Sequence, residues 1–181
     1  MPFPTQPGQI ILPAGALLGN EQVPVVNAGP QGVSASVVNI VNFAGSTITT
    51  APVSVTSSTT FVTTGLQASL QAGTYIFDAY LSVTNGAGGG IKVVGGGTAV
   101  ASLFVADTWS YNLTTVAAQT NVTSEASNLV AYTGSITTIN CTGTIVVSTA
   151  GTFNIQFAQN VSNGTATTVN SGSYLWIERV A

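Results

Sequence analysis

Charged residues are scarce in this chain of 181 residues, and histidine is absent. Lysine and arginine together number two and aspartate and glutamate five, so charged residues make up 4% of the chain, against about 25% in a typical globular domain. Without histidine the chain lacks the commonest general base and the commonest metal ligand, so Ser-His-Asp and Cys-His catalytic sites cannot form within it. Two basic side chains cannot build a phosphate-binding surface, which argues against nucleic acid as a partner.

Cysteine and long apolar runs are scarce as well. Cys141 is the single cysteine, so no disulfide can form within the chain, and we interpret it as a small buried residue rather than a nucleophile. No run of about 18 apolar residues occurs, so we expect no transmembrane helix and no membrane partner. The first 19 residues hold no Lys or Arg and are interrupted by proline and glycine, so we expect no secretory signal.

Residues that suit a pleated sheet are plentiful. Hydrophobic residues make up 45% of the chain, the mean hydropathy is +0.46, and Val, Ile, Thr, Phe and Tyr are abundant. These residues can supply a core, which argues against a disordered low-complexity chain. No segment of ten or more residues carries a helical stripe with caps. We therefore predict an all-β protein, an antiparallel jelly-roll sandwich of about eight strands.

The clearest predicted strand covers residues 73–83, where Tyr75, Phe77 and Leu81 share one face by the period of two and Asp78 lies on the other. We read the glycine runs 86–90 and 95–97 as turns rather than phosphate-binding loops, because they lack the lysine and the following helix of such loops. Further strands are expected at Thr59–Leu66, Ile91–Val94, Thr98–Val105, Trp109–Val116, Leu129–Ile139, Gly143–Ser148, Thr152–Gln159 and Ser173–Val180.

The N-terminal part differs in composition from the rest. Six of the seven prolines lie within the first 30 residues, and the seventh is Pro52. Proline removes donors from a sheet and favours extended, irregular backbone. We predict an arm over residues 1–56, with a few short strands, and a jelly-roll domain over residues 57–181. An arm without its own core must lie on something else, and the side chains assigned to attachment are Phe3, Ile10, Ile11, Leu12, Val23 and Val25.

Two sets of residues raise the question of an active or binding site. A glycosidase needs two carboxylates close together, and Asp78 and Asp107 are the best placed of the acids, but their strand positions favour solvated faces. The scattered acids predict no metal site, and nothing predicts a cofactor. Trp109, Trp176 and the tyrosines would suit a carbohydrate platform, although packing of core and subunits is the commoner use of aromatic residues.

The second half of the chain carries a succession of motifs. They are Leu70-Gln71-Ala72-Gly73-Thr74-Tyr75, Gly88-Gly89-Gly90-Ile91-Lys92-Val93, Gly97-Thr98-Ala99, Gly143-Thr144-Ile145-Val146-Val147, Ala150-Gly151-Thr152-Phe153-Asn154-Ile155-Gln156-Phe157-Ala158-Gln159-Asn160 and Ser171-Gly172-Ser173-Tyr174-Leu175. This succession resembles the jelly-roll domains of tailed-bacteriophage virion proteins found on head fibres, decoration proteins and tail fibres. Residues 19–25 are similar to short N-terminal repeat segments of such fibre proteins. The resemblance covers residues 57–181 well and the arm weakly.

The resemblance implies a structural protein of the virion outer surface, and the missing histidine and scattered acids predict that it is not an enzyme. The leading interpretation is a capsid decoration or head-fibre subunit that docks on the major capsid protein, or on another virion protein, through its arm. One alternative is a tail-fibre adhesin that binds a host glycan. Another is a spore-surface trimer, because the strand pattern is also similar to the tumour-necrosis-factor and C1q-like fold. The sequence lacks the Gly-x-y stalk that usually accompanies that fold.

Self-association is expected from the resemblance and from a surplus of apolar residues on the strands. A solvated strand face should be polar, yet Ile76 and Tyr80 alternate with Phe77 and Leu81. With so few charges, ion pairs cannot be the main contribution to such contacts. We predict a homotrimer whose packing residues are Tyr75, Phe77, Tyr80, Tyr174 and Trp176. The alternative cover for these strand faces is the arm.

Overall fold

The computed structural model describes residues 24–26, 34–36, 43–86, 88–113 and 115–180. The chain divides into two compact units, residues 1–42 and 43–181. In the first unit, β1 (Pro24–Val26) pairs antiparallel with β2 (Ser34–Ser36). All twelve remaining strands belong to the second unit, and the described ranges contain no helix.

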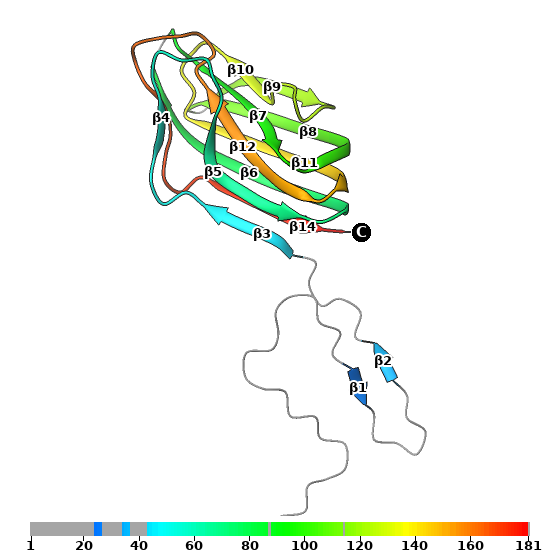
Figure 1. Cartoon of the computed structure of the whole chain (residues 1–181). Coiled ribbons are helices and arrows are strands. Elements are labelled where there is room, and N and C mark those ends of the chain that lie inside the picture. Colours follow the sequence, from blue (N-terminus) through cyan, green and yellow to red (C-terminus); the bar gives the residue numbers. More distant parts are fainter. Residues whose placement is uncertain (1–23, 27–33, 37–42, 87, 114, 181) are drawn as a thin grey trace, which may run out of the picture. The chain divides into compact units, whose positions relative to one another are not determined.

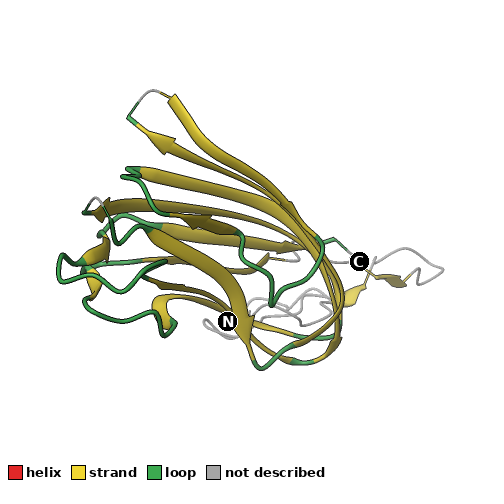
Figure 2. Cartoon of the chain, turned by 90° about the horizontal axis from the view of Figure 1, so that it is seen from above, coloured by secondary structure: helices red, strands yellow, loops and turns green. Residues whose placement is uncertain are grey.

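The second unit is a sandwich of two antiparallel sheets (Figures 1 and 2). The small sheet has the order β10 (Val130–Tyr132), β7 (Ile91–Gly97), β12 (Gly151–Ala158) and β5 (Val62–Leu70). The large sheet has the order β3 (Phe43–Ile48), β14 (Tyr174–Arg179), β6 (Gly73–Asn85), β11 (Thr138–Thr149), β8 (Val100–Asn112) and β9 (Thr115–Val122). Beyond β14, the far end of β6 pairs with β13 (Thr167–Val169), which pairs with β4 (Val53–Val55).

The strand order confirms the jelly roll. The chain passes from one sheet to the other between β5, β6, β7 and β8, stays in the large sheet for the hairpin β8–β9, and crosses again at β10, β11 and β12. As a result β5-β12-β7-β10 faces β6-β11-β8-β9, the arrangement of an eight-stranded double-sheet jelly roll. Strands β3 and β14 extend the large sheet beyond β6.

The core lies between the two sheets. Phe77 of β6 and Phe104 of β8 meet Phe153 of β12 from the opposite sheet, with ring centroids 5.4 and 6.3 Å from that of Phe153. At one side the sheets are joined by Thr47 of β3, whose hydroxyl donates to the carbonyl oxygen of Gln67 in β5 and accepts from its N–H. The inward faces therefore form one continuous apolar layer.

The structure corrects several details of the predicted strands. The predicted turn at residues 95–97 is the end of β7, where Gly95 leaves room for the ring of Phe153 and a Cβ would come within 3.1 Å of it. The two strands predicted within 98–116 form one, β8, because Phe104, Ala106 and the residues after them alternate inward without a break. The chain turns only at Leu113, which has a φ of +57°.

The sandwich unit begins before residue 57, the predicted start of the jelly-roll domain. Residues 43–56 were assigned to the arm, but β3 and β4 lie in this range and belong to the sandwich unit. The reason is that β3 pairs with the C-terminal strand β14, a contact between distant parts of the chain that composition does not reveal. The rest of the expected arm lies largely outside the described residues, and β1 and β2 are the described parts of it.

Candidate functional site

The outward face of the large sheet carries an aromatic and aliphatic surface. Tyr174 of β14 lies opposite Ile48 of β3 on one side and Tyr80 of β6 on the other, so the three share one face of the sheet. Two residues along β14, Trp176 follows on the same face, and Ile76 lies there on β6. We call the set Ile48, Ile76, Tyr80, Tyr174 and Trp176 the aromatic patch.

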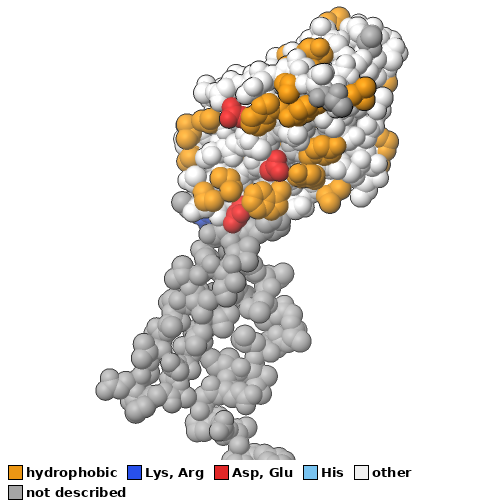
Figure 3. Space-filling model, turned by 180° about the vertical axis from the view of Figure 1, so that it is seen from behind, with side chains coloured by type: hydrophobic (Ala, Val, Ile, Leu, Met, Phe, Trp, Pro, Cys, Tyr) orange, Lys and Arg blue, Asp and Glu red, His pale blue; other side chains and the backbone are white. Residues whose placement is uncertain are grey.

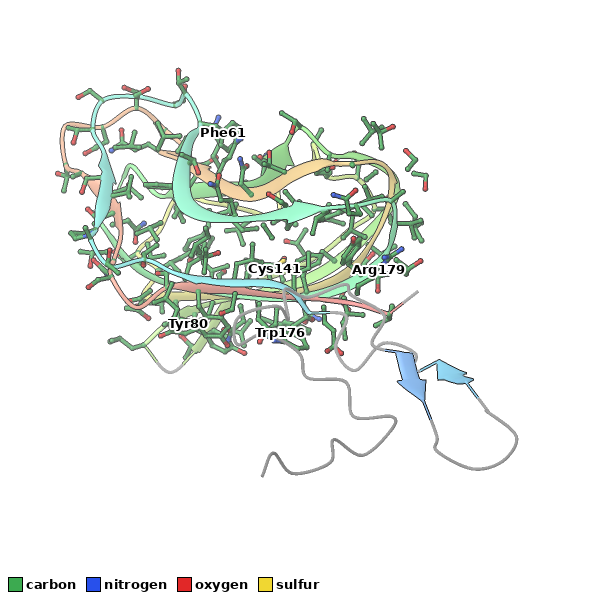
Figure 4. The ribbon with its side chains drawn as sticks, turned by 60° about the horizontal axis from the view of Figure 1, so that its bottom comes forward. Phe61, Tyr80, Cys141, Trp176 and Arg179 are labelled. Carbon is green, nitrogen blue, oxygen red and sulfur yellow. The ribbon has the colours of Figure 1, made fainter. Side chains whose placement is uncertain are left out.

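The two isoleucines of the aromatic patch are exposed, and its three aromatic side chains are half-buried. Ile48 is 63% exposed and Ile76 38% exposed. The rings of Tyr80 and Tyr174 stack with centroids 5.8 Å apart and planes inclined by 20°. Figure 4 shows Tyr80 and Trp176 on one outer side of the sandwich and Phe61 on the other, with Cys141 between the layers. Side chains of this kind usually face a core or a partner rather than water.

The same face continues across β11 onto β8. Asn140 lies between Tyr80 and Trp109 in the register, and Thr142 lies between Asp78 and Asp107. Figure 3 shows this side of the molecule, with hydrophobic side chains in bands and acidic side chains among them. Polar residues of β11 therefore lie between the aromatic patch and Trp109 of β8, and carboxylates lie on both sides of them.

The charge on this face has one sign. Asp78, Asp107 and Glu178 all occupy outward positions of the large sheet. Of the two basic residues, Lys92 lies on the small sheet with its ammonium 4.6 Å from the ring centroid of Phe61. Arg179 stands opposite Tyr75 at the end of β14 and donates to the carbonyl oxygen of Ala72.

Each aspartate of this face accepts a hydrogen bond. The hydroxyl of Tyr174 donates to Oδ2 of Asp78 at 3.2 Å, and Nδ2 of Asn121 donates to Oδ1 of Asp107 at 2.7 Å. Desolvation by burial, together with the charge of Asp78 and its hydrogen bond, raises the pKa of Tyr174. Tyr174 therefore remains a protonated donor to Asp78 at neutral pH.

The predicted packing residues separate into two groups. Tyr80, Tyr174 and Trp176 lie in the aromatic patch. Tyr75 and Phe77, each 2% exposed, lie in the core of the sandwich, which removes them from any surface that a second subunit could contact. The sequence already indicated this separation, because Tyr75 and Phe77 alternate with Ile76 and Tyr80, and neighbouring residues of a strand point to opposite faces.

Most of the predicted attachment residues lie outside the described part of the chain. They are Phe3, Ile10, Ile11, Leu12 and Val23. Val25 lies in β1, opposite Ala35 of β2. Ile48 was missed as a candidate, because it falls in the range assigned to the arm; the strand pairing that brings it beside Tyr174 is not visible in the sequence.

The structure places Asp78 and Asp107 on one row of the large sheet, with Thr142 of the intervening strand between them. Two strand spacings put their backbones about 10 Å apart. In the described residues no group of three or more His, Cys, Asp and Glu side chains is placed to hold a metal ion. In those same ranges no helix is long and apolar enough to cross a membrane.

Cys141 is buried on the inward face of β11, 3% exposed. Burial raises the pKa of its thiol to about 11, and the charges of Asp78 and Asp107 act in the same direction, while the Thr108 hydroxyl acts against it. A thiol with this pKa carries almost no thiolate at neutral pH, and the thiolate is the nucleophilic form. Cys141 therefore acts as a core residue.

Comparisons with known proteins give structural neighbours alone. No family model matches the chain, and no curated protein does. Among solved structures it is similar to VP2 of infectious bursal disease virus in a subviral particle, at 13% identity and a TM-score of 0.23. It is also similar to a mutant VP2 of that virus in derived T=1 particles, at 15% identity and a TM-score of 0.20. A third neighbour is the structure of the Gt strain of the virus, at 12% identity and a TM-score of 0.21.

The matches cover 88%, 90% and 94% of this chain and 47%, 46% and 51% of the others, so the chain spans about half the length of these neighbours. The neighbours are proteins of virus particles, and the superpositions are loose. The jelly-roll assignment rests on the strand order of the two sheets instead.

Proposed function

We propose that the chain is a non-enzymatic structural protein of a virus particle, a capsid decoration or head-fibre subunit, and that its jelly roll forms a homotrimer through the aromatic patch. The observation that carries the self-association is the outward face of the large sheet. An antiparallel sheet that faces water is polar on that side, whereas this one presents Ile48, Ile76, Tyr80, Tyr174 and Trp176 in register.

The composition supports close packing of copies. The chain has a formal net charge of −3, so long-range repulsion between subunits is weak. Obligate subunit interfaces bury about 2,000 Å² or more and are enriched in aromatic residues at their centre. The aromatic patch supplies such a centre.

Placement on a virion is supported by the motif succession that resembles phage jelly-roll proteins. We propose residues 1–42 as the attachment segment, since residues 43–56 belong to the sandwich. Its proposed partner is the major capsid protein or another virion protein, with the jelly roll on the outer surface of the particle.

The virion role is tested by peptide mass mapping of intact, purified particles from the source of the sequence. Peptides of this chain should be present in the particles and should disappear when the particle surface is digested by protease. Their absence from purified particles would refute the virion role.

The packing face is tested by the double variant Tyr174→Ser, Trp176→Ser. It should be monomeric at concentrations at which the unaltered protein is trimeric. Trp109→Ser is the matched control, because Trp109 lies on the same sheet face but two strands away from β6. A double variant that remains trimeric would refute the aromatic patch as the interface.

A glycan-binding role is the second candidate, and one observation favours it. Trp109 lies outside the aromatic patch with Asn140 beside it and Asp107 two residues along the same strand. A partly exposed indole beside hydrogen-bonding groups suits the apolar face and hydroxyls of a sugar. Strong binding on a glycan array that is lost in Trp109→Ser, together with no binding to particles, would favour this function over the first.

A further inference from the structure

Asp78 lies within the aromatic patch. On β6 it is flanked on the same face by Ile76 and Tyr80, and across the strands it stands opposite Trp176 and Thr142. The hydroxyl of Tyr174 is its hydrogen-bond donor, at 3.2 Å. A copy of the chain that covers the aromatic patch must therefore cover this carboxyl group as well.

The groups that face Asp78 include no cation in the described part of the sandwich unit. On β14 they are Tyr174 and Glu178, and on β6 the titratable neighbour is Tyr80. Strand β11 contributes the neutral residues Asn140 and Thr142. Beyond these, β8 adds a further acid, Asp107, and Tyr111, while β3 and β9 add no titratable group.

We infer that trimer formation takes up a proton at Asp78, so that the trimer is strengthened by acid and loosened as the pH rises. The inference rests on the proposed trimer. A carboxylate that loses water without gaining a cation is strongly destabilised, and a carboxyl group in that position becomes neutral instead. Once protonated, Asp78 can donate a hydrogen bond to an acceptor of the neighbouring subunit.

The size of the effect follows from proton linkage. If each of the three subunits takes up one proton, the association constant of the trimer changes by about 1,000-fold per pH unit. This holds in the pH range where the Asp78 carboxyl group is protonated in the trimer and ionised in the monomer. The protein concentration at half-assembly then changes by about 30-fold per pH unit, because that concentration varies as the inverse square root of the constant. Light scattering over a dilution series resolves such a shift.

The experiment compares the full-length protein with Asp78→Asn, which keeps the shape of the side chain and removes the charge. The unaltered protein should assemble at lower concentration near pH 5 than near pH 7.5. Asp78→Asn should assemble equally well at both and at least as tightly as the unaltered protein in acid. A pH-independent trimer of the unaltered protein, or a weaker trimer of Asp78→Asn, would overturn the inference; the second result would mean that a cation of the neighbouring subunit pairs with Asp78.

Two control variants separate Asp78 from other acids. Asp107→Asn lies on the same face, two strands away, and should keep the response to acid. Glu125→Gln should keep it as well; burial raises the pKa of Glu125, whose side chain lies beside Gly95 of the small sheet. Loss of the response in either control, with its persistence in Asp78→Asn, would overturn the assignment.

A second variant keeps the test decisive if Asp78→Asn does not fold. Asp78→Ser also removes the carboxyl group, so the assembly of this variant should not respond to acid. A response to acid in Asp78→Ser would contradict the inference. If instead the unaltered protein and every variant are monomeric from pH 5 to 7.5, the proposed trimer itself is refuted.

Discussion

The substitution Phe153→Ala tests whether the two sheets are held together by the aromatic cluster. Phe153 is fully buried, and its ring contacts Phe77 and Phe104 of the opposite sheet. Replacing a buried phenylalanine by alanine typically costs about 3–5 kcal/mol, from lost transfer free energy and from the cavity that remains. We expect the upper half of this range, because Phe153 pairs with two rings and each aromatic pair contributes about 0.5–1.5 kcal/mol beyond its buried area.

The assay is urea unfolding followed by tryptophan fluorescence, at a fixed protein concentration so that assembly contributes equally to each variant. Phe61→Ala is the matched control. Phe61 lies at the surface, where its contact with Lys92 is worth about 0.5–1 kcal/mol. A loss below about 1.5 kcal/mol for Phe153→Ala, or equal losses for the two variants, would refute the aromatic cluster as the centre of the core.

Three further predictions concern the thiol, a glycine and the first unit. Because burial raises the pKa of Cys141 to about 11 from 9.0, the unfolded chain ionises first, so the free energy of unfolding should fall by about 2–3 kcal/mol between about pH 9 and 11. Urea titrations should show this fall to be absent in Cys141→Ala, and an equal fall in both would contradict the prediction. Gly97→Ala should lower the free energy of unfolding by at least about 2 kcal/mol in the same assay, because φ is +126° and an added Cβ would collide with a carbonyl oxygen. Gly164→Ala is the control: an added Cβ would meet nothing within 4 Å, so this free energy should change by less than about 0.5 kcal/mol. A chain beginning at Phe43 should fold with unchanged circular dichroism in the sheet region and fail to bind particles; binding equal to that of the full chain would place attachment in the sandwich.

Sequence reasoning reached the architecture because the strands alternate strictly. In β6, Tyr75, Phe77 and Leu81 point inward and Asp78 points outward, as the period of two predicts. The same period separates core residues from surface residues. The predicted trimer-packing residues nevertheless included Tyr75 and Phe77 together with Tyr80, although these residues lie on opposite faces of one strand.

The remaining features depend on contacts between distant parts of the chain. Ile48 joins the aromatic patch because β3 pairs with β14, and no local pattern near residue 48 indicates that pairing. Glycine at positions 95–97 reads locally as a turn, yet Gly95 is needed in β7 because the ring of Phe153 occupies the space of its side chain. The position of Asp78 within the patch likewise follows from the register of three strands.

The mass of the full-length protein in solution measures whether the chain self-assembles, as proposed for the outward face of the large sheet. Light scattering at about 1 M salt, where electrostatic screening acts over roughly 3 Å, measures association through apolar contacts. We predict a mass three times that of the 18.2 kDa chain, and this mass should persist as salt is added. A monomeric mass at micromolar concentration, in both high and low salt and in acid, would contradict it.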